Sequence, residues 1–356
     1  MPKPNKKVVV AMSGGVDSSV AAALLKQQGY DVVGVFMQFW QPSGADYGEN
    51  RCCSLESYHE AREVAQILDI PIHKVNFGKE FKKTIVDEFI NEYKIGHTPN
   101  PCVACNKFIK FDLLLKYAQT IFDADYLATG HYIKIKQDSK GRCQLARPKD
   151  KNKDQTYFLY NLKQSQLKYL LFPLASYTKD QIRSLAKKLK LPIHSKPDSQ
   201  EICFVGKSHN DFLRSYLKPK TGKIFSDTGQ VLGEHQGLVF YTLGQRTGLC
   251  LSGGPWYIIE MNRKKNQLVV SKDSYHTKLL TSKINFKSAN WLIEDLKFPL
   301  KCQAQIRYRS KPLACVIKKN GNKLVAEFKR SPQAATAGQS IVFYDGDNLL
   351  GGGIIV

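Results

Sequence analysis

Hydrophobic and polar positions in the first third of the chain predict strands and helices that alternate. A run of valines at 8–10 is typical of a buried strand. After a short turn the apolar spacing becomes that of one helix face, at Val16, Val20, Ala23 and Leu24. The further elements predicted in this way are strands at 32–36, 71–75 and 126–129 and helices at 54–68, 79–93 and 108–122. This alternation predicts an α/β fold, with a parallel sheet, helices on both faces and ligands at the carboxyl ends of the strands.

The chain from 164 to 190 predicts two more helices. In the second, the apolar positions expected to face inward are Ile182, Leu185, Ala186 and Leu189. The positions expected to face outward are cationic: Lys179, Arg183, Lys187, Lys188 and Lys190. Such a face is either simply solvated or in contact with phosphates.

The pattern changes twice in the second half of the chain. Glycine-rich turns and short strands from 221 to 233 indicate a boundary near 207. Beyond 282 the pattern consists only of short strands, with turns at Asn320-Gly321 and Asp345-Gly346, as in a small antiparallel barrel. We therefore expect three domains: an α/β domain at 1–207, a small middle domain at 208–281 and a C-terminal β-barrel at 282–356.

The turn between the first strand and the first helix carries a chemical signature. Gly14 and Gly15 allow the main chain to approach a ligand, and the free N–H groups that open a helix attract anions. Ser13 and Ser18 add hydroxyl donors, and Asp17, as a carboxylate beside a polyphosphate, is suited to Mg²⁺. An ordinary strand-to-helix turn would not explain serines that surround a single acid. We therefore predict a site for a nucleotide polyphosphate.

The sequence Ser13-Gly14-Gly15-Val16-Asp17-Ser18 resembles the pyrophosphate loop (PP-loop) of the N-type ATP pyrophosphatase superfamily, and it lacks the Gly-Lys-Ser/Thr of a Walker motif. The resemblance implies that ATP is cleaved between its α and β phosphates and that a substrate oxygen is adenylated. Met37 and Gly130 follow neighbouring strands and are expected beside this loop. The ATP-binding residues expected are Ala11, Met12, Ser13, Gly14, Gly15, Val16, Asp17, Ser18, Met37 and Gly130.

Composition narrows the class of partner. The 356 residues include 53 Lys and Arg against 31 Asp and Glu, a formal net charge of +22. Such an excess favours a polyanion, with nucleic acid ahead of an anionic membrane surface. No run approaches the roughly 20 apolar residues of a membrane span, and the apolar run near the N-terminus is too short for a signal peptide, so we expect a cytoplasmic protein. The nine cysteines are then expected to be free, metal-bound or catalytic thiols.

Two cysteines differ in their local setting. Asn106 is a good N-cap for the helix predicted at 108–122, so Cys105 is expected at the positive end of that helix, where a thiol ionises easily. Cys203 has apolar flanks and, taken alone, is typical of a buried, inert cysteine.

Ordered motifs over essentially the whole chain resemble the tRNA-specific 2-thiouridylase family. They are Thr98-Pro99-Asn100-Pro101, Cys105-Asn106-Lys107, Ile109-Lys110-Phe111, Thr129-Gly130-His131-Tyr132, Lys153-Asp154-Gln155-Thr156-Tyr157-Phe158-Leu159, Asp198-Ser199, Ile202-Cys203-Phe204, Gly233-Glu234-His235-Gln236-Gly237, Thr242-Leu243-Gly244-Gln245-Arg246, Pro255-Trp256-Tyr257, Arg307-Tyr308-Arg309 and Gly338-Gln339-Ser340. The resemblance implies that ATP adenylates O2 of the wobble uridine (position 34) of tRNA, that sulfur replaces this oxygen, and that AMP and pyrophosphate are released.

The same resemblance assigns roles to single residues. Cys203 matches the persulfide-bearing cysteine and Cys105 the second catalytic cysteine, which either attacks the persulfide or closes a disulfide with Cys203. Target-base positions are Asn100, Pro101 and Cys102, and tRNA-contacting positions are His131, Lys153, Asp154, Gln155, Arg307, Tyr308 and Gln339. The partners implied are tRNAs that accept Lys, Glu and Gln, and a sulfur donor such as a cysteine desulfurase or sulfur-relay protein.

Cys102 departs from the family pattern, in which the best-known members carry an aspartate taken as a general acid or base. Cys102, Cys105 and Cys203 would suit a [4Fe-4S] cluster with one open iron, an alternative to the persulfide route. Two competing functions also stay open at this point. One is an amide-forming ligase similar to GMP or asparagine synthetase, which would need neither the charge nor the paired cysteines. The other is a tRNA-binding protein with a vestigial ATP site, against which the intact loop argues.

Overall fold

The computed structural model describes residues 6–42, 54–138, 141–198, 202–205, 208–294, 296–321 and 323–356. The first domain is built on a sheet with the strand order β3-β2-β1-β4-β7, in which every neighbouring pair is parallel. Its strands are β1 (Lys7–Ala11), β2 (Asp31–Gln38), β3 (Ile72–Asn76), β4 (Tyr126–Ala128) and β7 (Leu170–Leu171). Because β1 is central, the turn that follows it leaves from the middle of the carboxyl edge. This confirms the predicted α/β class.

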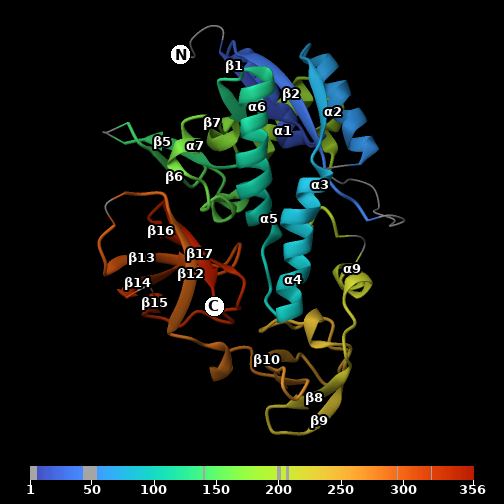
Figure 1. The fold of residues 1–356 in the computed structure, drawn as a ribbon, viewed down its shortest axis with the longest axis vertical. Helices are drawn as coiled ribbons and strands as arrows, with labels where there is room; N and C mark the ends of the chain where they lie inside the picture. Colours follow the sequence, from blue (N-terminus) through green and yellow to red (C-terminus); the bar gives the residue numbers. More distant parts are fainter. Residues whose placement is uncertain are drawn as a thin grey trace.

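Helices cover both faces of this sheet, as Figure 1 shows. Val8 and Val10 of β1 pack in a core with α1 (Val16–Gln27), α2 (Leu55–Ile67) and α8 (Lys179–Lys188). Val9 points to the opposite face and packs in a second core. The helices that supply this second core include α4 (Asp87–Ile95) and α6 (Leu114–Phe122).

The middle domain is a small sheet with the order β10-β11-β8-β9. The strands are β8 (Gly222–Ser226), β9 (Val231–His235), β10 (Tyr257–Asn262) and β11 (Gln267–Ser271). Helix α9 (His209–Tyr216) precedes it, and α4 of the first domain extends toward it (Figure 1). The Arg263 side chain at the end of β10 donates a hydrogen bond to the Gly96 carbonyl, just beyond α4, so the two domains are in direct contact.

The C-terminal domain is a closed antiparallel barrel, as predicted. Its strand order is β12-β15-β14-β13-β16-β17, and β12 also pairs with β17. The strands are β12 (Lys283–Trp291), β13 (Leu300–Gln305), β14 (Leu313–Asn320), β15 (Lys323–Phe328), β16 (Ser340–Asp345) and β17 (Asn348–Ile355). The hairpin of β5 (Lys134–Gln137) and β6 (Cys143–Ala146) pairs with β17, which links the first domain to the barrel. None of the helices within the described ranges has both the length and the apolar character needed to cross a membrane.

Candidate active site

The turn after β1 has a conformation that explains its glycines. Gly14 has a φ of +70°, and a Cβ built on it would lie 2.3 Å from the Ser57 carbonyl oxygen in α2. Gly15 is the N-cap of α1, and among the described residues no side chain caps the helix there. The main-chain N–H groups that open α1 are therefore left to a ligand at the carboxyl edge of the sheet.

The serines of the turn hold one another in place. The Ser13 N–H donates to Ser18 Oγ over 3.1 Å, and the two hydroxyl oxygens are 3.3 Å apart. The hydroxyls of Ser18 and Ser19 both donate to the Gly15 carbonyl, at 3.1 Å and 2.9 Å. These bonds preorganise the turn around the start of α1, in a form that oxyanions can enter without a change of fold.

The other residues predicted to bind ATP surround this turn or lie beside it. Gly130 packs so closely that a Cβ on it would lie 2.7 Å from the Ser18 nitrogen. Ala11, Met12 and Val16 are buried at the end of β1 and the start of α1, and Met37 is buried near the end of the adjacent β2. Their ATP contacts stay predictions.

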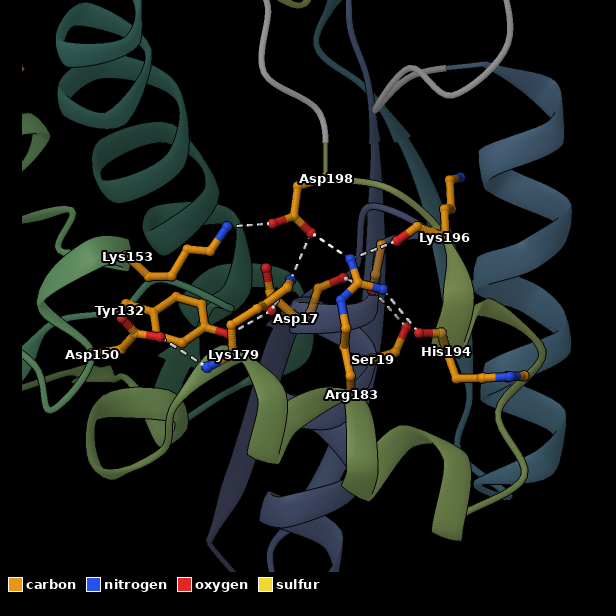
Figure 2. Close-up of polar contacts among 12 residues, drawn as sticks. Asp17, Ser19, Tyr132, Asp150, Lys153, Lys179, Arg183, His194, Lys196 and Asp198 are labelled. Carbon is orange, nitrogen blue, oxygen red and sulfur yellow. Dashed lines mark hydrogen bonds and ion pairs between the residues drawn. The ribbon is translucent and has the colours of Figure 1, made fainter. Parts of the chain in front are cut away.

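Five ionisable side chains form a network beside the turn, shown in Figure 2. Lys179 Nζ lies 2.7 Å from Asp17 Oδ1 and 2.7 Å from Asp198 Oδ1. Lys153 Nζ is 2.6 Å from the other Asp198 oxygen, and an Arg183 nitrogen is 3.2 Å from Asp198 Oδ1. Three cations thus surround two carboxylates where a polyphosphate is expected.

The structure corrects the expectation that Lys179 and Arg183 face outward. Lys179 is only 8% exposed, because it is the first residue of α8 and points to the turn after β1. Arg183, one turn later on the same side, also donates to the carbonyls of His194 and Lys196 at 2.9 Å each. Lys187 and Lys188 are exposed, as expected. Lys179 and Arg183 are four residues apart, so the sequence alone already places them on the same side of the helix.

The pKa values in the network reflect these contacts. Burial alone would raise the pKa of Asp198, but hydrogen bonds from Lys153 and Lys179 hold it below its ordinary value. The Tyr132 hydroxyl donates to Asp17 Oδ1 over 2.7 Å. Burial and the charge of Asp17 raise the pKa of Tyr132, so its hydroxyl keeps the proton that it donates.

The helix that carries Cys105 begins earlier than predicted. Asn100, not Asn106, is the N-cap: its side chain accepts from the Val103 N–H at 3.3 Å, and Pro101 occupies the first helical position. Cys102 is therefore in the first turn and exposed, whereas Cys105 is 8% exposed at the start of the π-helical segment Cys105–Leu113. Asn106 is buried and donates to the Phe158 carbonyl, which explains why it does not cap.

Cys203 lies beside the same core as Cys105. Cys105 belongs to the larger core of the first domain and Cys203 packs against it, next to Phe204, whose ring contacts Phe81 and Phe89. Ser199, from the motif before Cys203, lies outside the described residues. In the part of the chain that the structure describes, no three His, Cys, Asp or Glu side chains are placed to hold a metal ion. The iron–sulfur alternative through Cys102, Cys105 and Cys203 stays a prediction.

Several residues predicted to contact tRNA have structural partners instead of open surface. His131 is buried against Phe111 and Phe172 and hydrogen-bonds Thr129; burial and the nearby Lys110 lower its pKa well below the usual value. The buried carboxylate of Asp154 pairs with Arg147, and Gln155 accepts from the Tyr132 N–H at 2.9 Å. The RNA contacts of these residues stay predictions.

The remaining predicted tRNA contacts lie where domains meet. Arg307 donates to the carbonyls of Leu243 and Ala334, at 2.9 Å and 2.8 Å. Tyr308 packs on Phe158, with ring centres 4.4 Å apart. Gln339 Nε2 donates over 2.7 Å to the Thr98 carbonyl, two residues before Asn100. The barrel is thereby attached to the segment predicted to receive the target base.

A parallel sheet with an oxyanion-ready turn at its central strand defines a nucleotide-binding α/β domain. Family models match all three parts of the chain: a tRNA methyl transferase HUP domain at 6–207, a tRNA methyl transferase PRC-barrel domain at 210–272 and an aminomethyltransferase beta-barrel domain at 281–355. The chain is 48% identical to the tRNA-specific 2-thiouridylase MnmA of Clostridium perfringens, over 98% of both chains. It is 47% identical to that of Clostridioides difficile, over 99% of this chain and 98% of the relative.

The chain belongs to the tRNA-specific 2-thiouridylase family, which confirms the resemblance drawn from its motifs. Among solved structures, a 4-thiouridine synthetase–RNA complex with bound ATP is 18% identical, with a TM-score of 0.37 over 59% of this chain and 49% of that one. The exact domain boundaries at 207/208 and 281/282 stay predictions.

Proposed function

We propose that this chain is an ATP-dependent tRNA-uridine 2-sulfurtransferase, which thiolates the wobble uridine (position 34). The observation that carries the proposal is the family identity, which extends over nearly the full length of the chain and of its relatives. The preorganised turn at Ser13–Ser18 and the three cations beside it supply what adenylation requires. A substrate oxygen is a poor leaving group until it is joined to phosphate.

The chemistry proceeds in two stages. O2 of the uridine attacks the α phosphate of ATP, and pyrophosphate leaves. The terminal sulfur of a persulfide on Cys203 then attacks C2 of the uridine, and AMP leaves with the original oxygen. The Cys105 thiolate attacks the inner sulfur of Cys203, which breaks the S–S bond, leaves the outer sulfur on the base and forms a Cys105–Cys203 disulfide. Alternatively, Cys105 releases the sulfur from the persulfide before the base is attacked.

Asp17 is the residue that would hold Mg²⁺. Its Oδ1 accepts hydrogen bonds from Tyr132 and Lys179. One carboxylate together with phosphate oxygens is a common way for proteins to bind Mg²⁺, and the ion would neutralise charge on the phosphates. The acceptors proposed are tRNAs for Lys, Glu and Gln, with sulfur from a cysteine desulfurase or relay protein, in the cytoplasm, where ATP and tRNA are available.

The test incubates the full chain with ATP, Mg²⁺, a persulfide donor and unmodified tRNA, and measures AMP and 2-thiouridine. We expect both products from the native protein. Asp17→Ala should abolish both, and Cys203→Ser should abolish 2-thiouridine alone. Cys143→Ser, a buried cysteine of β6 without an assigned role, is the matched control.

Three outcomes would contradict parts of this proposal. AMP without thiolated tRNA from the native protein would refute the sulfurtransferase assignment. Normal thiolation by Cys203→Ser would show that another residue carries the sulfur. Activity that requires reconstituted iron would eliminate the persulfide route, whereas full activity of iron- and sulfide-free protein with a persulfide donor would eliminate the cluster alternative.

A further inference from the structure

Two cysteines of the barrel, neither of which has a role in the proposed chemistry, face each other. Cys302 in β13 and Cys315 in β14 are direct partners in the antiparallel register of the two strands. Their sulfur atoms are 3.6 Å apart. Cys315 is buried in the barrel core at 4% exposure, whereas Cys302 is only partly buried against that core.

Close thiols in a core are often no more than small apolar side chains. The strand register here, however, places the two residues directly opposite each other, where a disulfide can form. Residues directly opposite in an antiparallel pair have Cα atoms about 4.5–5.5 Å apart, within the range of about 4.4–6.8 Å found across disulfides. Rotation of the two side chains is then enough to bring the sulfur atoms into bonding distance, without movement of either strand.

We propose that Cys302 and Cys315 are a redox-active pair, which a low-molecular-weight disulfide converts into an intramolecular disulfide. The Cys302 thiolate attacks the small disulfide, forms a mixed disulfide and releases one small thiol. The Cys315 thiolate then attacks the Cys302 sulfur and releases the second thiol. Two protein thiols are oxidised, one small disulfide is reduced to two thiols, and the protons of the protein thiols pass to the products.

The order of attack follows from exposure. Cys302 is the sulfur that a reagent in solution can reach, and Cys315 is shielded by the barrel core. Hydrogen bonding to Cys315 and burial raise the pKa of the Cys302 thiol, so its thiolate is scarce near neutral pH. Attack by Cys302 on the small disulfide is therefore faster at higher pH.

The bond would close the base of a hairpin whose turn holds the domains together. That turn, at 306–312, contains Arg307, which is bonded to the Leu243 and Ala334 carbonyls, and Tyr308, which packs on Phe158. Oxidation would fix the two strands that present this turn. We therefore expect slower hydrogen exchange across β13 and β14 in the oxidised protein.

The test needs neither ATP nor tRNA, so its outcome is separate from that of the proposed function. The native chain is treated with increasing oxidised glutathione, free thiols are blocked with N-ethylmaleimide, and trypsin digestion without reduction is followed by mass spectrometry. Cleavage after Lys301, Arg307, Arg309 and Lys318 leaves the two cysteines on separate peptides, 302–307 and 310–318. We expect these peptides to appear linked, lighter by two hydrogens than their sum.

Single-cysteine variants test whether the two thiols react with each other in the proposed order. Cys315→Ser should stop at glutathione attached to Cys302. Cys302→Ser should leave Cys315 unmodified until the protein is denatured, and Cys143→Ser should behave as the native chain does. The proposal is overturned if 302–307 and 310–318 stay unlinked in the native fold, or if they link no more often than either does to the peptides of Cys143 and Cys250.

Discussion

Replacement of Lys179 by Met tests whether the network beside the loop is held together by this one side chain. Lys179 is buried and lies 2.7 Å from a carboxylate oxygen of both Asp17 and Asp198. Methionine preserves most of the volume of the side chain and removes the charge. The substitution therefore leaves the packing nearly intact and sets two carboxylates side by side without the cation between them.

The expected magnitude follows from burial and from the contacts that remain. Removal of one partner of a fully buried ion pair costs about 3–5 kcal/mol. Asp198 keeps Lys153 and Arg183, Asp17 keeps the Tyr132 hydroxyl, and both acids are partly exposed. Solvent and these contacts reduce the loss, so we expect the free energy of unfolding of the first domain to fall by about 2–3 kcal/mol.

The assay isolates the first domain through Trp40, which packs against its core. The chain has three tryptophans, Trp40, Trp256 and Trp291, so a background with Phe at the other two leaves a single reporter. Urea unfolding in this background is compared for Lys179→Met and for Lys187→Met, an exposed position of the same helix. The control should lie within about 0.5 kcal/mol of its parent.

A second substitution identifies the cause of the loss. If uncompensated charge is responsible, Asp198→Asn added to Lys179→Met should recover about 1 kcal/mol, although Asp198→Asn alone destabilises. The reasoning is refuted if Lys179→Met is no less stable than Lys187→Met, or if the double variant is as unstable as the sum of its single substitutions predicts.

Three further predictions concern the same domain. Gly14→Ala places a Cβ 2.3 Å from a main-chain oxygen of α2 and should weaken ATP binding at least about tenfold, whereas Gly29→Ala, with similar positive φ but open space, should not; equilibrium dialysis compares the two. Because the native pKa of Asp198 is lowered from its ordinary 3.8, its pairs stabilise the fold fully above that pH and progressively less as pH falls through the lowered value. The free energy of unfolding should therefore fall less steeply with decreasing pH in Asp198→Asn than in the native chain. Cys102→Asp introduces the aspartate that the resemblance implies at this position and should thiolate tRNA with a persulfide donor; loss of activity would show that the thiol is required.

The hydrophobic pattern predicted the first domain well because the apolar positions that define each element lie close together in the sequence. The valines of β1 and the apolar face of α1 are adjacent in sequence, and both are buried as predicted. The helix predicted at 108–122 begins earlier, at Pro101, and this start was missed because the spacing of its apolar residues is irregular. A π-helical segment at Cys105–Leu113 shifts the 3.6-residue spacing, so Phe108, which fits a regular buried face, is 43% exposed. The Asn-Pro pair that does mark the start was available in the sequence.

The part of the site that the sequence predicts most directly is the part whose residues form one continuous motif. The turn Ser13–Ser18 is such a motif, and in the structure its serines hydrogen-bond within the turn. Lys179 was missed because its partners are distant in sequence: Asp17 lies 162 positions away, and only the fold brings the two together. A hydrophobic pattern determines which side of α8 is buried, but it does not predict that a lysine at the helix start reaches a carboxylate on another helix.

The motif Lys153-Asp154-Gln155 connects the network beside the nucleotide loop to the barrel. The three residues of the motif contact three different partners. Lys153 pairs with Asp198, Asp154 pairs with Arg147, and Gln155 accepts a hydrogen bond from the main chain of Tyr132. The Tyr132 hydroxyl in turn binds Asp17, while Arg147 stacks on the Tyr344 ring of the barrel at 4.1 Å. One short segment of the chain is therefore connected both to the network beside the nucleotide loop and, through Arg147, to the barrel.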